Sequence, residues 1–201
     1  LMDLRIAQDL PVLQAYDQAL CDRVARELAT TGQVQVPTMV LAHAEVQALP
    51  AARQHDPQFR QAPADVRERW NGILATLPAK PSDLSMQKWK ATLALVATLH
   101  RAGVPLMAGT DAPSPLVYPG HALHLELALL VEAGLSPAEA LRAATLVPAR
   151  YLGIADESGT IAVGKRADLV LLDADPLRDI TNTRRIHAVL LGGRAVDSGP
   201  Q

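Results

Sequence analysis

The chain has 201 residues, of which 49% are hydrophobic and 20% charged, and its formal net charge is -2 at pH 7. Charges of both signs are interspersed, which argues against a nucleic-acid-binding surface or a polybasic membrane anchor, and the single cysteine, Cys21, excludes an internal disulfide. No apolar run approaches the roughly 18 residues of a membrane span, and residues 1–10 lack the features of a signal peptide. We therefore expect a cytoplasmic globular protein with no nucleic-acid or membrane partner.

The sequence of residues 11–81 predicts a helix, then a strand, then a segment that crosses the protein surface. Residues 11–31 repeat apolar positions with helical period, whereas residues 33–42 are rich in valine and threonine, as strands are. Pro37 lies inside this predicted strand and suits an edge or a bulge, because proline cannot donate a ladder hydrogen bond. Residues 50–81 are polar and punctuated by proline, with one predicted helix at 63–77, so we expect them to cross the surface as a lid or flank.

Further helices surround a second predicted strand. Residues 82–103 predict a long amphipathic helix, residues 104–107 a short strand buried on both faces, and residues 121–133 another helix. The sequence Ser-Pro-Ala-Glu that begins at Ser136 is typical of a helix start with a capping box, and a short helix follows Pro148. This order of helices and strands is that of a parallel α/β sheet.

The character of the sequence changes near residue 154. Residues 159–176 and 184–197 are short β-rich runs interrupted by glycine and Asp-Pro, and Gly192-Gly193 favours a two-residue hairpin turn. We therefore predict an α/β part over residues 1–153 and a small β subdomain over residues 154–201.

Asp111 ends the predicted strand in the sequence Gly-Val-Pro-Leu-Met-Ala-Gly-Thr-Asp-Ala, residues 103–112. In parallel α/β folds, the loops at the carboxyl ends of the strands carry the functional site. A carboxylate there can bind a divalent metal, or can take a proton from water and pass it to a leaving group. Gly109 allows a tight turn and Thr110 could orient the carboxylate, although a simple turn cap before Pro113 would give the same pattern.

Three ordered blocks carry a resemblance to a known family. They are GVPLMAGTDAP at residues 103–113, LHLELALLVEAGLSPAEALRAATLVPARYLG at residues 123–153 and GTIAVGKRADLVLLDADPL at residues 159–177. Together they resemble the C-terminal part of the amidohydrolase superfamily, nearest to its imidazolonepropionase-like and dipeptidase or carboxypeptidase-like branches. The resemblance runs from about residue 90 to the end, and more loosely back to residue 33.

The resemblance implies a partial (β/α)8 TIM-type barrel, with residues 33–42 and 104–109 as strands seven and eight, followed by a β-sandwich segment. It implies that Asp111 ligates a divalent metal, usually zinc, and acts as general base and acid on the hydrolytic water. The substrate would be a small molecule with an amide-type C–N bond, such as a dipeptide or a cyclic amide. We expect Thr110 and His121 to contact it.

The other metal ligands of the family have no counterpart in this chain. The resemblance implies a His-x-His pair and further histidines, but no two histidines here are separated by one residue; they are His43, His55, His100, His121, His124 and His187. A barrel alone takes about 250 residues, more than the 201 present. We therefore expect the C-terminal half of such an enzyme, without most of its ligands.

Several alternatives stay open. His121 and His124 are three residues apart on one predicted helix and could join Asp111 in a replacement zinc site, although such histidines more often pack or face solvent. His43 is expected in a surface loop. The chain could also be a catalytically inert fragment that acts as a scaffold, forms a homo-oligomer or pairs with a separate N-terminal half. An unrelated doubly wound nucleotide-binding domain has no support, because the sequence holds no Gly-rich phosphate loop.

Overall fold

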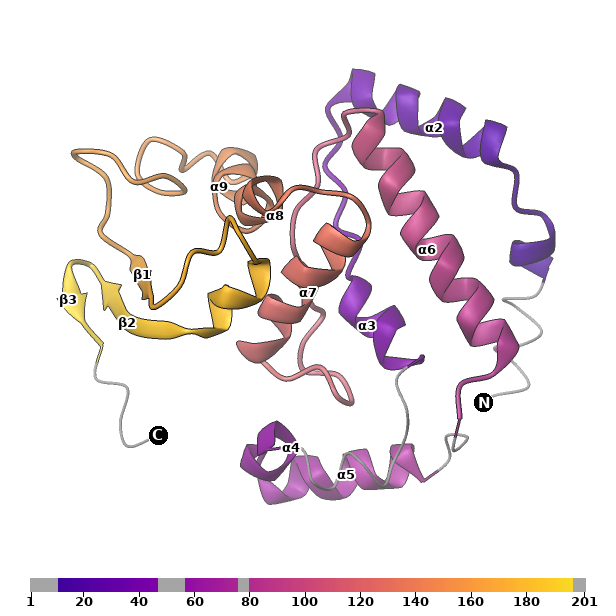
Figure 1. Ribbon diagram of the computed structural model, residues 1–201, viewed down its shortest axis with the longest axis horizontal. Coiled ribbons are helices and arrows are strands. Elements are labelled where there is room, and N and C mark those ends of the chain that lie inside the picture. Colours follow the sequence, from indigo (N-terminus) through magenta and orange to yellow (C-terminus); the bar gives the residue numbers. More distant parts are fainter. Residues whose placement is uncertain (1–10, 47–56, 76–79, 197–201) are drawn as a thin grey trace.

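Helices form most of the computed structural model, which describes residues 11–46, 57–75 and 80–196 (Figure 1). The helices are α2 (Gln18–Thr31), α3 (Met39–Ala44), α4 (Pro57–Gln61), α5 (Ala64–Leu74), α6 (Asp83–Arg101), α7 (His121–Glu132), α8 (Pro137–Ala144) and α9 (Leu146–Tyr151). The strands β1 (Leu169–Leu172), β2 (Ile186–Leu191) and β3 (Arg194–Ala195) follow, with the 3-10 helix η2 (Ile180–Arg184) between the first two. Within these described ranges, no helix has both the length and the apolar character needed to cross a membrane.

The helices α2 and α6 lie side by side (Figure 1). The helix predicted over residues 11–31 is divided, because a short helical turn comes first and α2 begins only after Asp17. The Asp17 carboxylate accepts hydrogen bonds from the amides of Ala19 (2.8 Å) and Leu20 (3.2 Å), and so caps a new helix. Gly32, with a φ of 67°, ends α2 in the left-handed conformation that favours glycine.

Two extended segments, around Gln35 and Leu106, pair in parallel within the helical part of the chain. The Gln35 amide donates to the Pro105 carbonyl, and the Met107 amide donates to the Gln35 carbonyl, each at 2.9 Å. Both segments are short, and each makes a single bridge rather than a long ladder. The parallel neighbourhood predicted for these two strands is therefore present, with less regular structure than the sequence suggested.

The second half of the strand predicted over residues 33–42 is a helix instead. Thr38 has a left-handed φ of 50°, and α3 begins at the next residue. The first two amides of α3, those of Met39 and Val40, donate to the two carboxylate oxygens of Glu126 at 3.0 and 2.8 Å. Because Glu126 belongs to α7, a residue distant in the sequence starts this helix and overrules the local strand preference.

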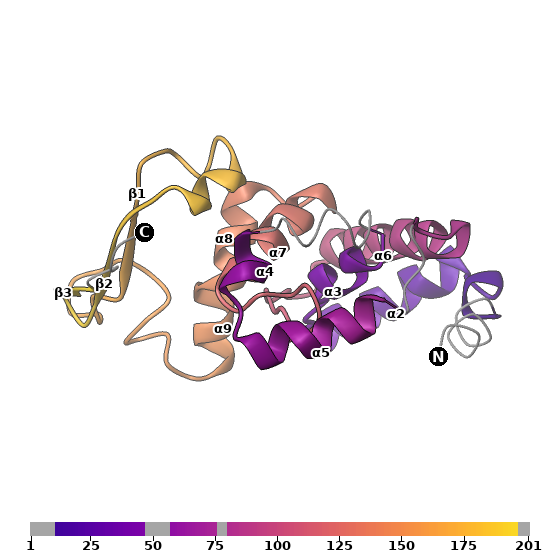
Figure 2. The same cartoon turned by 90° about the horizontal axis from the view of Figure 1, so that it is seen from below.

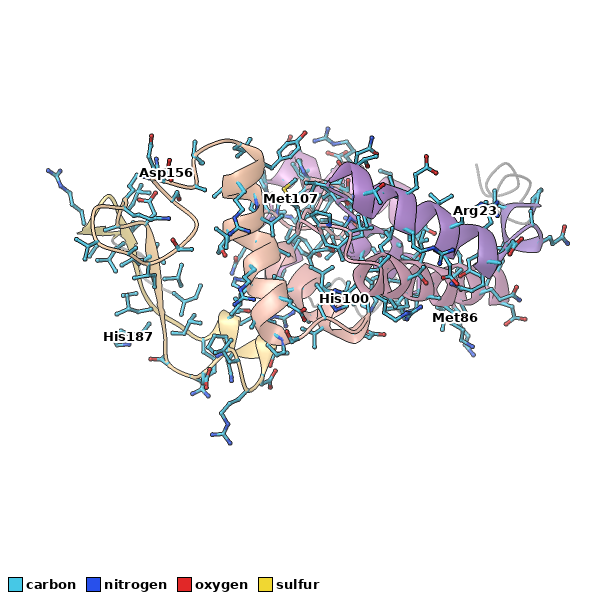
Figure 3. The ribbon with its side chains drawn as sticks, turned by 90° about the horizontal axis from the view of Figure 1, so that it is seen from above. Arg23, Met86, His100, Met107, Asp156 and His187 are labelled. Carbon is cyan, nitrogen blue, oxygen red and sulfur yellow. The ribbon has the colours of Figure 1, made fainter. Side chains whose placement is uncertain are left out.

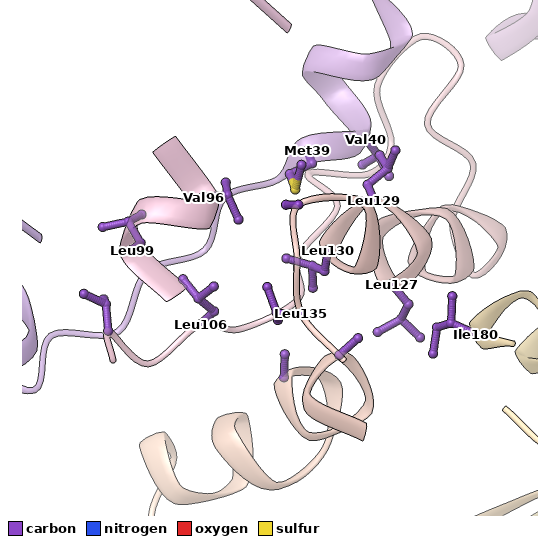
Figure 4. Close-up of a cluster of buried hydrophobic side chains, with 14 of the residues drawn as sticks. Met39, Val40, Val96, Leu99, Leu106, Leu127, Leu129, Leu130, Leu135 and Ile180 are labelled. Atoms are coloured by element: carbon purple, nitrogen blue, oxygen red, sulfur yellow. The ribbon is translucent and has the colours of Figure 1, made fainter. Parts of the chain in front are cut away.

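The main hydrophobic core lies among α3, α6, α7, α8 and the segment around Leu106 (Figure 4). The helix α7 agrees with the prediction over residues 121–133, and its buried residues recur at helical spacing; they are Ala122, Glu126, Leu127, Leu129 and Leu130. Leu130 and Met39 are fully buried at the centre of this core. Leu127 lies on another side of α7, toward Ile180 of η2 (Figure 4).

The capping box predicted at the start of α8 is confirmed. The amide of Glu139 donates to the Ser136 hydroxyl at 3.3 Å, and the amide of Ser136 donates to the Glu139 carboxylate at 2.7 Å. The helices predicted over residues 63–77 and 82–103 are present as α5 and α6, although residues 76–77 lie outside the described residues. The short helix predicted after Pro148 is α9, which begins two residues earlier, at Leu146, so that Pro148 lies in its first turn. Local sequence signals therefore account for most of the helical elements.

The helices α4 and α5, residues 57–74, form an arm beside the main core (Figure 2). A separate apolar cluster holds the arm. In it, the ring centroids of Phe59 and Trp70 are 6.4 Å apart, and Trp70 and Tyr118 form a T-shaped pair with centroids 5.5 Å apart. Leu116 packs against the same cluster. Because residues 116 and 118 belong to the loop after Asp111, the arm, which is part of the segment predicted to cross the surface, packs against that loop.

The strands β1, β2 and β3 form one antiparallel sheet in that order, apart from the helical core (Figure 1). The predicted turn at Gly192-Gly193 joins β2 to β3. The Asp168 carboxylate fixes this turn, because it accepts a hydrogen bond from the Gly192 amide at 2.8 Å. Residues 159–163, which the sequence predicts to be β-rich, form turns and irregular structure instead. The division at residue 154 stays a prediction.

Replacing Glu126 with glutamine should reduce the pH dependence of stability. Burial raises the pKa of Glu126 from 4.5 to about 7, and the two amide hydrogen bonds act in the opposite direction. A group whose pKa is raised on folding stabilises the fold fully below its unfolded pKa, and this contribution is lost as the pH rises through the folded pKa. Between pH 4.5 and pH 7, we expect the unfolding free energy of the parent chain to fall by up to about 3 kcal/mol more than that of Glu126→Gln. Urea denaturation at several pH values measures the difference, and equal losses would contradict the prediction.

Replacing Trp70 with alanine should release the arm. Trp70 is buried and is the residue that contacts both Phe59 and Tyr118, so we expect a loss of about 3 kcal/mol in stability and faster thermolysin cleavage within residues 57–74. Arg69→Ala is the matched control, because Arg69 is the exposed neighbour and makes only a 3.9 Å surface ion pair with Asp65. Similar cleavage rates in the two variants would show that the aromatic cluster does not hold the arm.

Candidate catalytic site at Asp111

Asp111 follows the buried segment that pairs with Gln35, at the carboxyl end of that segment. Gly109 packs so closely on the Val36 side chain that a Cβ atom at position 109 would overlap it. This contact explains the glycine, because only a residue without a side chain lets the two segments approach this far. The glycine two residues before Asp111 therefore allows two chain segments to cross in close contact.

The Asp111 side chain is exposed, and its backbone is left-handed with a φ of 52°. The Ser114 hydroxyl donates to the Asp111 carbonyl at 2.9 Å, which stabilises the turn that follows. Thr110 is half-buried beside it. An exposed carboxylate at the end of a buried segment can accept a proton or bind a cation, so the chemistry expected of Asp111 is compatible with its placement.

His121 and His124 both lie in the first turn and a half of α7, and both are half-buried. His124 is engaged elsewhere, because its Nδ1 lies 3.0 Å from the hydroxyl of Thr183 in η2. Burial lowers the pKa of His124, and the nearby His121 and Arg184 lower it further. His124 is therefore a packing residue on the side of α7 that meets η2, and the described residues do not form the three-ligand zinc site with Asp111 and His121.

The other histidines of the described chain have packing or surface roles. His43 lies in α3 and not in a surface loop as expected, because α3 replaces the end of the predicted strand; its ring centroid is 5.1 Å from that of Trp89, and burial lowers its pKa. His100 ends α6 and lies 3.8 Å from the Glu139 carboxylate, while His187 lies on β2, 3.0 Å from Asp173. Figure 3 shows His100 and His187 in different parts of the molecule. His55 lies outside the described residues.

The metal that the resemblance implies does not fit the described residues taken alone. Among residues 11–46, 57–75 and 80–196, no three or more histidine, cysteine, aspartate or glutamate side chains are grouped so that they could hold a metal ion. A catalytic zinc site requires three protein ligands and an open position. Asp111 is thus one candidate ligand without partners in the described part of the chain.

Glu126 is the residue that the sequence reasoning did not identify. It is 0% exposed, and its two carboxylate oxygens accept the amides that begin α3, next to the segment that packs on Gly109. A signal was available, because Ala122, Glu126 and Leu129 follow each other at steps of four and three residues. A carboxylate within an apolar stripe of this kind points to a buried polar contact.

Comparison with known proteins gives the family context. Residues 83–196 match the model of the amidohydrolase family. The imidazolonepropionase of Thermoplasma volcanium is 33% identical over 88 residues, which are 44% of this chain and 22% of that protein. The imidazolonepropionase of Deinococcus deserti is 31% identical over 202 aligned positions, covering 84% of this chain and 50% of that protein. The adenine deaminase of Methylobacterium nodulans is 37% identical over 118 residues, or 55% of this chain and 20% of that protein.

Solved structures agree on the fold. A Xaa-Pro dipeptidase with methionine bound in its active site superposes with a TM-score of 0.61 at 22% identity, over 86% of this chain and 37% of that one. Molinate hydrolase superposes with a TM-score of 0.56 at 26% identity, over 87% of this chain and 35% of that one. The chain thus spans between a fifth and a half of the length of these five relatives. Because the family model covers more than half of its 201 residues, the chain belongs to the amidohydrolase family.

Proposed function

We propose that this chain is the C-terminal part of a metal-dependent amidohydrolase that hydrolyses an amide-type C–N bond of a small substrate, a dipeptide or a cyclic amide. The observation that carries the proposal is the placement of Asp111 at the carboxyl end of a buried segment with a parallel neighbour. Active sites of α/β barrels gather at this end of the strands. The family membership makes hydrolysis the expected reaction class.

In this proposal, residues 1–153 are the last part of a (β/α)8 barrel, and the segments around Gln35 and Leu106 are its seventh and eighth strands. Residues 154–201 are the segment that completes a β-sandwich beside the barrel. The parallel bridge and the position of the antiparallel sheet after residue 154 support this division. The similarity in fold to amidohydrolase structures supports it as well.

Asp111 takes the role of general base and acid in the proposed reaction, and it is also the candidate ligand of a divalent metal, most simply zinc. An exposed carboxylate can accept the proton of an attacking water and return it to the leaving nitrogen. Thr110 and His121 are proposed to contact the substrate, since one adjoins Asp111 and the other begins the next helix. The remaining metal ligands have to come from outside the described residues.

The substrate class rests on the names of the relatives. Proteins named imidazolonepropionase and adenine deaminase are similar to this chain in sequence, and a Xaa-Pro dipeptidase is similar to it in fold. The compounds in these names, an imidazolone, adenine and a dipeptide, are all small molecules. A location in the cytoplasm, and the absence of nucleic-acid and membrane partners, belong to the same proposal and rest on the composition of the chain.

A second candidate is a catalytically inert chain that acts as a scaffold, forms a homo-oligomer or pairs with a separate N-terminal half. Two observations favour it. Asp111 has no grouped metal-ligand partners in the described residues. The β part also exposes large apolar side chains, with Ile161 at 88%, Val170 at 55% and Leu191 at 65% exposure. Apolar surface of this kind favours association with another chain.

The isolated 201-residue chain tests whether this chain carries a complete metal site by itself. We expect it to bind less than one zinc per chain and to show no hydrolysis of dipeptides or cyclic amides, because a single carboxylate cannot hold a catalytic zinc. Atomic absorption after dialysis against zinc, and an amine-release assay, measure both properties. Stoichiometric zinc together with turnover would contradict the inert chain.

Reading the gene upstream of Leu1 tests the enzyme proposal directly. We expect an open reading frame that encodes a His-x-His pair and later histidines, and its absence would remove the basis for a complete metal site.

In a protein that unites this chain with such an N-terminal half, Asp111→Asn should abolish most turnover. Loss of the carboxylate removes the proton acceptor, so we expect kcat to fall by roughly 10² to 10⁴, with KM nearly unchanged. Asp156→Asn is the control, because Asp156 is an exposed aspartate outside the proposed site. Steady-state kinetics on the best dipeptide or cyclic amide measures the effect. Equal activity in the two variants would remove Asp111 from the mechanism.

A further inference from the structure

Glu126 links α7 to the start of α3 through its carboxylate. Its helix, α7, begins at His121, soon after the loop that carries Asp111. Its carboxylate accepts the amides of Met39 (3.0 Å) and Val40 (2.8 Å), the first two of α3. Both of these residues are buried, as is Glu126 itself, so water does not compete for these hydrogen bonds.

The segment just before α3 is the one that packs on Gly109. Val36 occupies the space beside Gly109 that a side chain would need, and the Thr38 hydroxyl lies 3.9 Å from the Cβ position that residue 109 would have. Thr38 is held in a left-handed conformation immediately before the capped helix. A shift of the start of α3 would therefore move the surface on which the residues before Asp111 rest.

The hydrogen bonds of Glu126 are formed at the expense of burying its carboxylate. Burying a carboxylate without a charged partner is unfavourable, and burial raises the pKa of Glu126 to about 7, which reflects this penalty. An apolar side chain would avoid the penalty but would leave the buried amides of Met39 and Val40 unpaired. The carboxylate therefore sets where α3 begins, next to the two crossing segments.

We propose that Glu126 is a positioning residue for Asp111. Glu126 fixes the start of α3, and the contact of Val36 with Gly109 transmits this position to the chain that leads to Asp111. This inference rests on the proposed function for its catalytic consequence, and on the hydrogen bonds and packing alone for its structural part. Glu126 itself contacts neither Asp111 nor the substrate in this proposal.

Hydrogen exchange in the 201-residue chain tests the structural part. The reporters are the amides of Gln35 and Met107, which form the parallel bridge and make no contact with the Glu126 carboxylate. Their exchange is expressed relative to that of the α6 amides, which report unfolding of the whole chain. In Glu126→Ala we expect the relative exchange of the reporters to rise by about tenfold, because the bridge loosens locally.

Two further variants show whether the carboxylate is responsible. Glu126→Gln keeps one acceptor oxygen, so it can satisfy one of the two α3 amides and should restore part of the protection that Glu126→Ala loses. Leu127→Ala removes a buried residue of the same helix that faces Ile180 rather than α3, and should leave the relative exchange within about twofold. The inference is wrong if, in Glu126→Ala, the exchange rates of the Gln35 and Met107 amides rise only as much as those of the α6 amides. It is also wrong if Leu127→Ala raises the relative exchange of the same two amides equally.

The catalytic part uses the protein with both halves. Glu126→Ala should lower kcat by about tenfold with KM within about twofold, because a small displacement of Asp111 affects the reaction more than substrate binding. Leu127→Ala should change neither value, even if it lowers Tm. An unchanged kcat in Glu126→Ala would overturn the positioning role. If the unsubstituted protein shows no turnover, the proposed function fails, and the exchange result alone then decides whether Glu126 orders the segment before Asp111.

Discussion

The helical part of this chain depends on one parallel contact, the pair of main-chain hydrogen bonds that joins Gln35 to Pro105 and Met107. The contact joins segments that are far apart in the sequence, and Leu106 at its centre is buried in the main core. It also decides where Gly109 crosses Val36, and therefore where the chain turns out to Asp111. Parallel neighbours cannot be joined by a tight turn, so the long connection that holds α3, α4, α5 and α6 follows from the same constraint.

Much of the secondary structure was predictable because its causes are local. The capping box at Ser136, the apolar spacing of α7 and the Gly192-Gly193 turn each contain their own signal within a few residues. The predicted strand over residues 33–42 was wrong in its second half because the cause lies on α7, where the Glu126 carboxylate begins α3. A sequence window that ends at residue 42 contains no trace of that carboxylate.

In the candidate site, too, the features with a local cause were predictable from the sequence, and those that depend on distant residues were not. Asp111 could be identified from the residues around it, since Gly109 and the short apolar run mark the end of a buried segment. The roles of the histidines could not, because ring contacts and hydroxyl partners come from other elements. His43 meets Trp89 of α6, and His124 meets Thr183 of η2. Glu126 gave a readable signal, a carboxylate on an apolar stripe, but its partner could be found only in three dimensions.

The arm of α4 and α5 has its own apolar cluster, separate from the main core, and touches the loop after Asp111 through Leu116 and Tyr118. A segment anchored in this way can be exchanged, lengthened or lost among related chains without repacking the centre of the molecule. Inherited variation can therefore accumulate beside the Asp111 loop while the crossing of the two buried segments is preserved. Because the two apolar clusters are separate, a change in the arm leaves the packing of Gly109 on Val36 intact.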